Sequence, residues 1–169
     1  MPATTLLEEA LQAWTYAREG VIAEVENVPE ASLERIPPGG ARTIGDLARH
    51  ILGSGRLMAG ELSRPDGDFM RLPHPELVAE HVGNAAEVRG KDALLDALRL
   101  SLADGQRRLR EAGELRMLQH IRQFNGELAT RLSWMHHGIA HEEYHRGQIA
   151  LTARLLGTVP ALTKLIHGE

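Results

Sequence analysis

Histidine is concentrated late in this sequence, where five of the nine histidines fall: His120, His136, His137, His141 and His145. His141 and His145 are four residues apart, so on a helix both side chains lie on one side, about one turn from each other. Two imidazoles in that arrangement can bind one metal ion, but a single helix does not complete its coordination shell. The first chemistry to consider is therefore the binding of a divalent metal.

A third ligand has to come from another helix, and His50 is the histidine beside the apolar face of such a helix. Three neutral imidazoles suit Zn, Ni or Fe, and they leave coordination positions open for water or substrate. We therefore predict one divalent metal ion per chain, bound by His50, His141 and His145. The alternative is that His50 is a hydrogen-bonded core residue, and that His141 and His145 face solvent.

The roles of the residues near His141 and His145 are predicted less specifically. His137 lies one turn before His141, at the expected rim of the site, as a proton shuttle, a fourth ligand or a hydrogen-bond donor; the alternative is a polar residue on the helix surface. Gln148 is within reach of a ligand histidine or a loop carbonyl. Gly147 is expected to permit close helix contact. No catalytic residue is assigned.

The segment from His141 to His145 also matches the HExxH pattern of zinc peptidases, in which the glutamate is the general base. On a helix, however, Glu142 points about 100° away from His141. The sequence also lacks the strand patterns of a peptidase sheet. We therefore do not expect protease activity.

Capping signals and apolar spacing indicate the helices that position these residues. Thr5 followed by Glu8, and Thr43 followed by Asp46, predict helix starts, and Pro29 ends the first helix. The four expected helices span residues 4–28, 43–63, 92–112 and 128–156. Between the second and third helices we expect a long crossover over residues 64–90, with at most one short helix near 75–81. A linker over residues 114–126 precedes the fourth helix. Because no strand is expected, we predict an all-α four-helix bundle that forms a single domain over residues 1–169.

Composition and charge restrict the classes of function. The chain has 169 residues, of which 43% are hydrophobic and 25% charged, as in an ordinary globular domain. Its net charge of −4, without a cluster of Lys and Arg, argues against nucleic-acid binding. The absence of cysteine excludes disulfides and thiolate ligands. No signal-like start and no apolar run of about 18–20 residues is found, so we expect a cytoplasmic protein that does not bind a membrane.

Two segments of the sequence, TIGDLARH at residues 43–50 and HEEYHRGQI at residues 141–149, resemble the DinB-like (damage-inducible, YfiT-related) family of metal-binding four-helix bundles. The His-Arg-Gly-Gln run at residues 145–148 is the most specific part. The Pro-Pro-Gly-Gly loop at 37–40 and the Leu-Leu-Gly ending at 155–157 are also similar to that family. The resemblance therefore extends over nearly the whole chain.

This resemblance implies an up-up-down-down bundle with a long crossover between the second and third helices, a homodimer, and a Zn, Ni or Fe-type ion at His50, His141 and His145. Similar proteins include transferases that use bacillithiol or mycothiol, a thiol-dependent isomerase of maleylpyruvate, and metal-dependent hydrolases. The implied function is that of a metal-dependent thiol S-transferase or hydrolase, which acts on a small-molecule substrate with a low-molecular-weight thiol as possible cosubstrate. The alternative is a non-catalytic, metal-stabilised stress-response or binding module.

Overall fold

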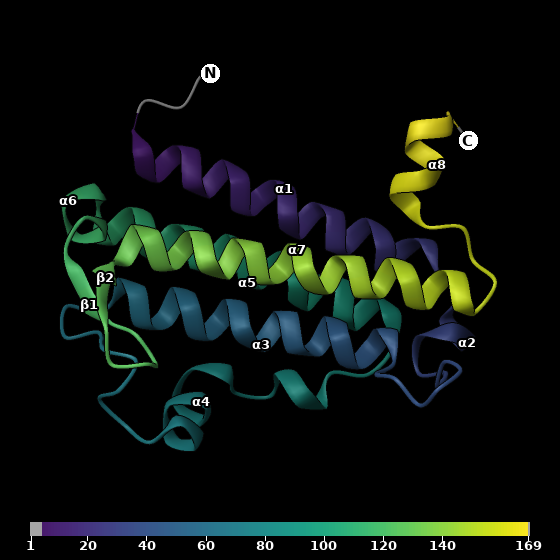
Figure 1. Ribbon diagram of the computed structural model, residues 1–169, viewed down its shortest axis with the longest axis horizontal. Helices are drawn as coiled ribbons and strands as arrows, with labels where there is room; N and C mark the ends of the chain where they lie inside the picture. Colours follow the sequence, from purple (N-terminus) through teal and green to yellow (C-terminus); the bar gives the residue numbers. More distant parts are fainter. Residues whose placement is uncertain (1–4, 169) are drawn as a thin grey trace.

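Four long helices packed side by side make up most of the computed structural model, which describes residues 5–168 (Figure 1). They are α1 (Leu6–Asn27), α3 (Ile44–Ser63), α5 (Lys91–Ala112) and α7 (Arg131–Leu155). The predicted caps are present, because the side-chain oxygens of Thr5 and Thr43 accept hydrogen bonds from the amides of Glu8 and Asp46. The all-α class is therefore confirmed, and the long helices begin and end close to the predicted residues.

The four long helices do not all alternate in direction along the chain. The chain reverses between α1 and α3, and the long crossover then returns it to the end at which α3 began, so α3 and α5 are parallel (Figure 1). α7 runs antiparallel to α3, since Arg131 at the start of α7 donates to the carbonyl of Leu62 near the end of α3. The order is up-down-down-up, which differs from the up-up-down-down order that the resemblance implies. The long crossover itself is confirmed.

The crossover packs along α3 and contains α4 (His74–Val82) and the 3-10 helix η1 (Ala85–Glu87), where one short helix was expected. The buried carboxylate of Glu61 on α3 accepts hydrogen bonds from the backbone amide of Asp68 and from the side chain of Arg71, and it pairs with His81. Farther along the crossover, Arg56 on α3 donates to the carbonyl of Val82. These contacts fix the crossover to α3 over most of its length.

Short elements account for the main differences from the sequence-based expectation. They are α2 (Glu30–Leu33), α6 (Glu114–Met117), α8 (Ala161–His167) and an antiparallel hairpin of β1 (His120–Arg122) and β2 (Leu128–Thr130). The expectation of no strand was therefore wrong, because strands of three residues are too short to show an alternating pattern. The available signal was the turn pair Asn125-Gly126, in which Gly126 has a φ of +84°.

The apolar core consists of two clusters, one toward each end of the bundle. The first includes Trp14 and Met135, and the second includes Val21, Ile51 and Ile149. No helix within residues 5–168 combines the length and the hydropathy needed to cross a membrane. The bundle is thus built around two buried apolar clusters.

Candidate metal centre

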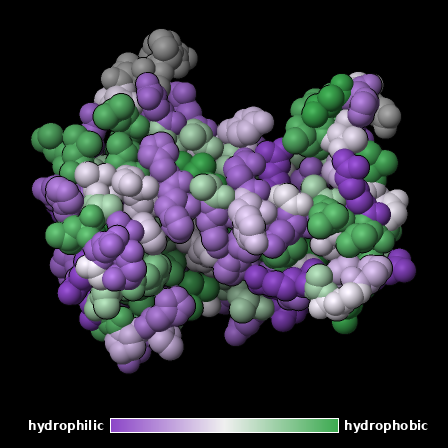
Figure 2. Space-filling model, viewed as in Figure 1, coloured by the Kyte–Doolittle hydropathy of each residue, from purple (hydrophilic) through white to green (hydrophobic). Residues whose placement is uncertain are grey.

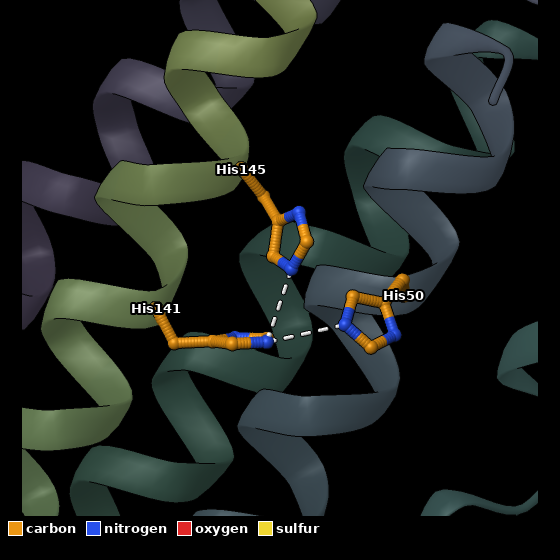
Figure 3. A group of neighbouring side chains, drawn as sticks. All are labelled: His50, His141 and His145. Atoms are coloured by element: carbon orange, nitrogen blue, oxygen red, sulfur yellow. Dashed lines mark hydrogen bonds between the residues drawn. The ribbon is translucent and has the colours of Figure 1, made fainter. Parts of the chain in front are cut away.

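His50, His141 and His145 meet between α3 and α7 (Figure 3). The Nε2 atom of His141 lies 3.1 Å from Nε2 of His50 and 3.1 Å from Nε2 of His145. One ring nitrogen from each of the three residues lies within 4.8 Å of the others. The structure therefore brings together all three residues predicted as ligands, each presenting Nε2 to a common point.

The arrangement follows from the way α7 packs against two helices. His141 and His145 are one helical turn apart and face α3, where His50 lies beside the buried residues Leu47 and Ile51. Gly138, one turn before His141, lies so close to α3 that an added Cβ would come 2.0 Å from the sulfur of Met58. The close approach of α3 and α7 at Gly138 brings the imidazoles from the two helices within reach of each other.

The distances from Nε2 of His141 to the other two Nε2 atoms fit the coordination sphere of a small divalent ion. With metal–nitrogen bonds of about 2.0–2.1 Å, neighbouring ligand atoms are about 2.9 Å apart in octahedral geometry and about 3.3 Å apart in tetrahedral geometry. The separations of 3.1 Å between His141 and each of the other two histidines lie between these values. The donor set and its spacing therefore fit Zn, Ni or Fe.

Gln148 orients one of these rings, as the sequence suggested. Its side-chain Oε1 lies 2.6 Å from Nδ1 of His145. Because an amide oxygen only accepts hydrogen bonds, this contact assigns the proton to Nδ1, and the lone pair of His145 is then on Nε2, toward His141. Such contacts fix the tautomer and orientation of a histidine before it binds a metal.

Burial and neighbouring positive charge favour the neutral imidazole at His50 and His141, because both lower the pKa of these rings. Burial is the main cause that lowers the pKa of His50 from 6.5 to about 4, and His145, His141 and Arg42 lower it further. The pKa of His141 is also lowered, mainly by burial and then by His145. Neutral imidazole is the form that binds metals, so near pH 7 protons compete little for these two rings.

A cavity of about 450 Å³ lies beside His50, between α3 and the crossover, and it also contacts Ser54, Leu57, Val78 and Arg89. This volume is in the range of pockets that enclose small molecules. A ligand in the cavity would therefore lie next to His50, the one residue of the three-histidine group that lines it. The sequence pattern did not reveal this wall of the site, because it is formed by the crossover, whose position no helical periodicity specifies.

Three residues near the histidine pair lie outside the centre. Glu142 is buried, and its carboxylate accepts hydrogen bonds from Trp14 and Arg18, in agreement with the expectation that it does not act as a peptidase base. His137 is exposed, with its ring stacked on Trp134 at 4.3 Å between centroids. Gly147 is exposed and would meet nothing within 4 Å if it had a Cβ, so the expected helix contact there is wrong.

Comparisons with known proteins agree with this fold. A family model described as the DinB superfamily matches residues 13–149. Among solved structures, the mycothiol-dependent maleylpyruvate isomerase superposes with a TM-score of 0.68 at 16% identity, over 94% of this chain and 65% of the isomerase. A histidine-to-alanine mutant of the mycothiol-dependent enzyme gives 0.63 at 15% identity, over 94% and 65% of the two chains. These identities establish similarity of fold alone, and no curated protein sequence matches.

Proposed function

This chain belongs to the DinB superfamily, and from that premise we propose that it is a metal-dependent enzyme in which His50, His141 and His145 bind one divalent ion. We propose a thiol S-transferase, or else a hydrolase, that acts on a small molecule. The observation that supports this most strongly is the convergence of three Nε2 atoms, one of them from His50, which also lines a cavity of about 450 Å³. A purely structural metal site would not require an adjoining cavity of this size.

A divalent ion in this position would act as a Lewis acid that lowers the pKa of a thiol or a water molecule. Residues of the chain provide the environment for that chemistry. His50 and His141 remain neutral near pH 7 because burial lowers their pKa values, and Gln148 holds the ring of His145. Apolar side chains such as Val78 and Leu57 line the cavity and reduce the access of water to a bound substrate.

The proposal of a thiol cosubstrate is supported by the similarity to an isomerase that depends on mycothiol. This chain covers 65% of the length of that isomerase, and its own reaction and substrate are a separate proposal. With no cysteine in the sequence, a reacting thiol would have to come from a second small molecule. A hydrolase would use water at the same position. The two reactions therefore differ in whether turnover requires an added thiol.

His137 is the residue we propose for proton transfer. Its exposed ring is stacked on Trp134, one turn before His141 on α7. Substitution with asparagine should leave the metal content unchanged and reduce turnover, because asparagine cannot exchange a proton near pH 7. Equal reductions of metal content and turnover would instead make His137 a ligand.

The proposed function is tested by turnover on a defined panel. Purified protein loaded with Zn, Ni or Fe is incubated with low-molecular-weight thiols and electrophilic acceptors, and in parallel with carboxylic esters without thiol. Loss of thiol that requires both the metal and His141 would support the transferase, whereas ester cleavage without thiol would support the hydrolase. A metal that is bound and needed for folding, with no turnover on either panel, would favour the non-catalytic stress-response or binding module.

The homodimer and the cytoplasmic location stay predictions. Apolar side chains are exposed near the end of α7 and on α8, where hydrophobic surface gathers in Figure 2; they include Leu155, Val159, Leu165 and Ile166. Exposed apolar patches commonly mark association surfaces. Light scattering should give twice the chain mass for the wild type and the chain mass for Ile166→Glu. A monomeric wild type would contradict the dimer.

A further inference from the structure

The cavity beside His50 is a groove along α3. Its floor consists of residues of α3 from Asp46 to Leu57, a span of about 16 Å at the rise of an α-helix. Its opposite wall comes from the crossover, from His74 at one end to Arg89 at the other. His50, one of the three histidines, thus lines an elongated groove that is longer than a metal-bound water or a simple thiol needs.

Polarity changes along this groove. Val78, Val82 and Ala86 line its wall on the crossover, and Gly53 and Leu57 line its floor. Gly53 allows the walls to approach, because a Cβ at this position would lie 3.1 Å from Cγ1 of Val82. The middle of the groove therefore suits an apolar chain or ring rather than a polar group.

Arginines gather at one end of the groove. Arg42, Arg49 and Arg89 all line it. A hydrogen bond from Arg42 to the backbone oxygen of Asp46, and one from Arg49 to the carbonyl of Val88, show that the three side chains belong to the same end. This end is next to His50, which directly follows Arg49 on α3 and also lines the groove.

The three arginines differ in their partners. Arg49 is buried and already paired with the carboxylates of Glu34 and Asp46, so its charge is compensated within the protein. Over residues 5–168, Arg42 and Arg89 have no carboxylate within ion-pair distance, and their hydrogen bonds go to backbone carbonyls. Two guanidinium groups at the mouth of an apolar groove thus have donors available for an anionic ligand.

We propose that this groove binds an elongated organic carboxylate, with its carboxylate held by Arg42 and Arg89 and its apolar body along Val78 and Val82. The ligand's position beside the histidine centre rests on the proposed function, whereas the anion site itself does not. The carboxylate can belong to the acceptor molecule or to a thiol cosubstrate that carries one. In both cases Arg42 and Arg89 determine specificity, and Arg49 positions the segment that contains Arg89.

Calorimetric titration of the protein with octanoate tests the proposal. Metal is first removed with a chelator, so that the carboxylate cannot bind to an ion at the histidines. Octanoate should bind, with octanol and butyrate each at least about tenfold weaker, because the first lacks the charge and the second lacks the apolar length. Arg42→Gln and Arg89→Gln should each weaken octanoate binding about tenfold. Arg99→Gln, the same change at an exposed position of α5, should leave octanoate binding unaffected.

Equal affinity of the wild type and both arginine variants for octanoate would overturn the proposal, as would binding that occurs only when metal is present. Whether the histidines bind metal is measured separately by metal content, so failure of the groove proposal and failure of the metal proposal can be told apart. Competition with glutathione, a thiol with two carboxylates, identifies the source of the anion. Displacement of octanoate by glutathione from the wild type assigns the groove to the thiol cosubstrate, and the absence of displacement assigns it to the acceptor.

Discussion

Arg18 on α1 and Glu142 on α7 form an ion pair at the centre of the bundle, with Nη2 of Arg18 2.5 Å from Oε1 of Glu142 and both side chains almost fully buried. Arg18 also donates to the carbonyl of Leu98 and to the hydroxyl of Ser101 on α5, so this pair connects three helices. Glu142 directly follows His141 in the sequence. His141 therefore faces the histidine centre, whereas Glu142 connects the helices that support that centre.

Glu142→Gln should destabilise the fold without removing the metal site. Gln leaves the buried charge of Arg18 uncompensated, and the loss of one partner from a buried pair typically costs about 3–5 kcal/mol. Urea unfolding measures this free energy, with Glu143→Gln as control, since Glu143 is partly exposed and its contact with Arg146 is 3.3 Å. A variant with wild-type stability that binds no metal would instead make Glu142 part of the metal centre.

Gln148→Ala should weaken metal binding and leave folding nearly unchanged. The substitution removes the hydrogen bond that holds Nδ1 of His145, and loss of such a contact commonly reduces metal affinity about 10–100-fold. Competition with a chromophoric chelator gives the affinity, and Gln12→Ala, at an exposed position of α1, is the matched control. Unchanged affinity in Gln148→Ala would show that the ring of His145 needs no such support.

Gly138 and Gly147 offer a matched pair of substitutions on α7. Gly138→Ala should lower the free energy of unfolding by about 1–3 kcal/mol and weaken metal binding, because its Cβ would displace Met58 and push α7 from α3. Gly147→Ala should be neutral or stabilising by up to about 1 kcal/mol, since its Cβ meets nothing within 4 Å and alanine favours helix. Similar effects of the two substitutions would contradict the close contact at Gly138.

Glu61 should make the stability of the protein depend on pH in the acid range. Burial alone would raise the pKa of Glu61, but hydrogen bonds from His81, Arg71 and the amide of Asp68 outweigh it and lower the pKa from 4.5 to about 2. The stabilisation is therefore fully present above about pH 4.5 and is lost as the pH falls toward 2. The shift corresponds to about 3 kcal/mol.

The measurement compares wild type with Glu61→Gln by denaturant unfolding between pH 2 and pH 7. The difference in stability between the two proteins should be constant above about pH 5 and shrink below it. Other carboxylates titrate in both proteins and cancel in the difference. Parallel curves over the whole range would show that the Glu61 carboxylate is not selectively stabilised in the folded state.

The parts of the fold predicted from sequence are those that local chemistry determines. Thr5 and Thr43 marked the starts of α1 and α3 because an N-cap is a contact between residues three apart. The convergence of His50 with His141 and His145 was predicted from helical spacing on two helices. The caps depend on geometry within one helix. The histidine convergence joins two helices, and it could be predicted because a metal bound by His141 and His145 needs a further ligand from another helix.

Other contacts between distant segments, which no metal chemistry indicated, were missed. α8 starts where the buried carboxylate of Glu24, on α1, accepts hydrogen bonds from the amides of Ala161 and Leu162. Nothing in the local sequence of α8 indicates that contact. Likewise, Arg18 falls within the apolar stripe of α1, four residues after Trp14, which was a signal for a buried polar group but not for its partner.

The three-histidine centre is tested most directly by measuring the metal content of the purified, untagged protein with elemental mass spectrometry. Wild type is compared with His50→Ala and His145→Ala, and with His136→Ala as a control at an exposed position of α7. We predict about one divalent ion per chain in the wild type and the control, and little in the other two variants. A folded wild type that takes up no Zn, Ni or Fe, or full metal content in His50→Ala and His145→Ala, would contradict the three-histidine centre.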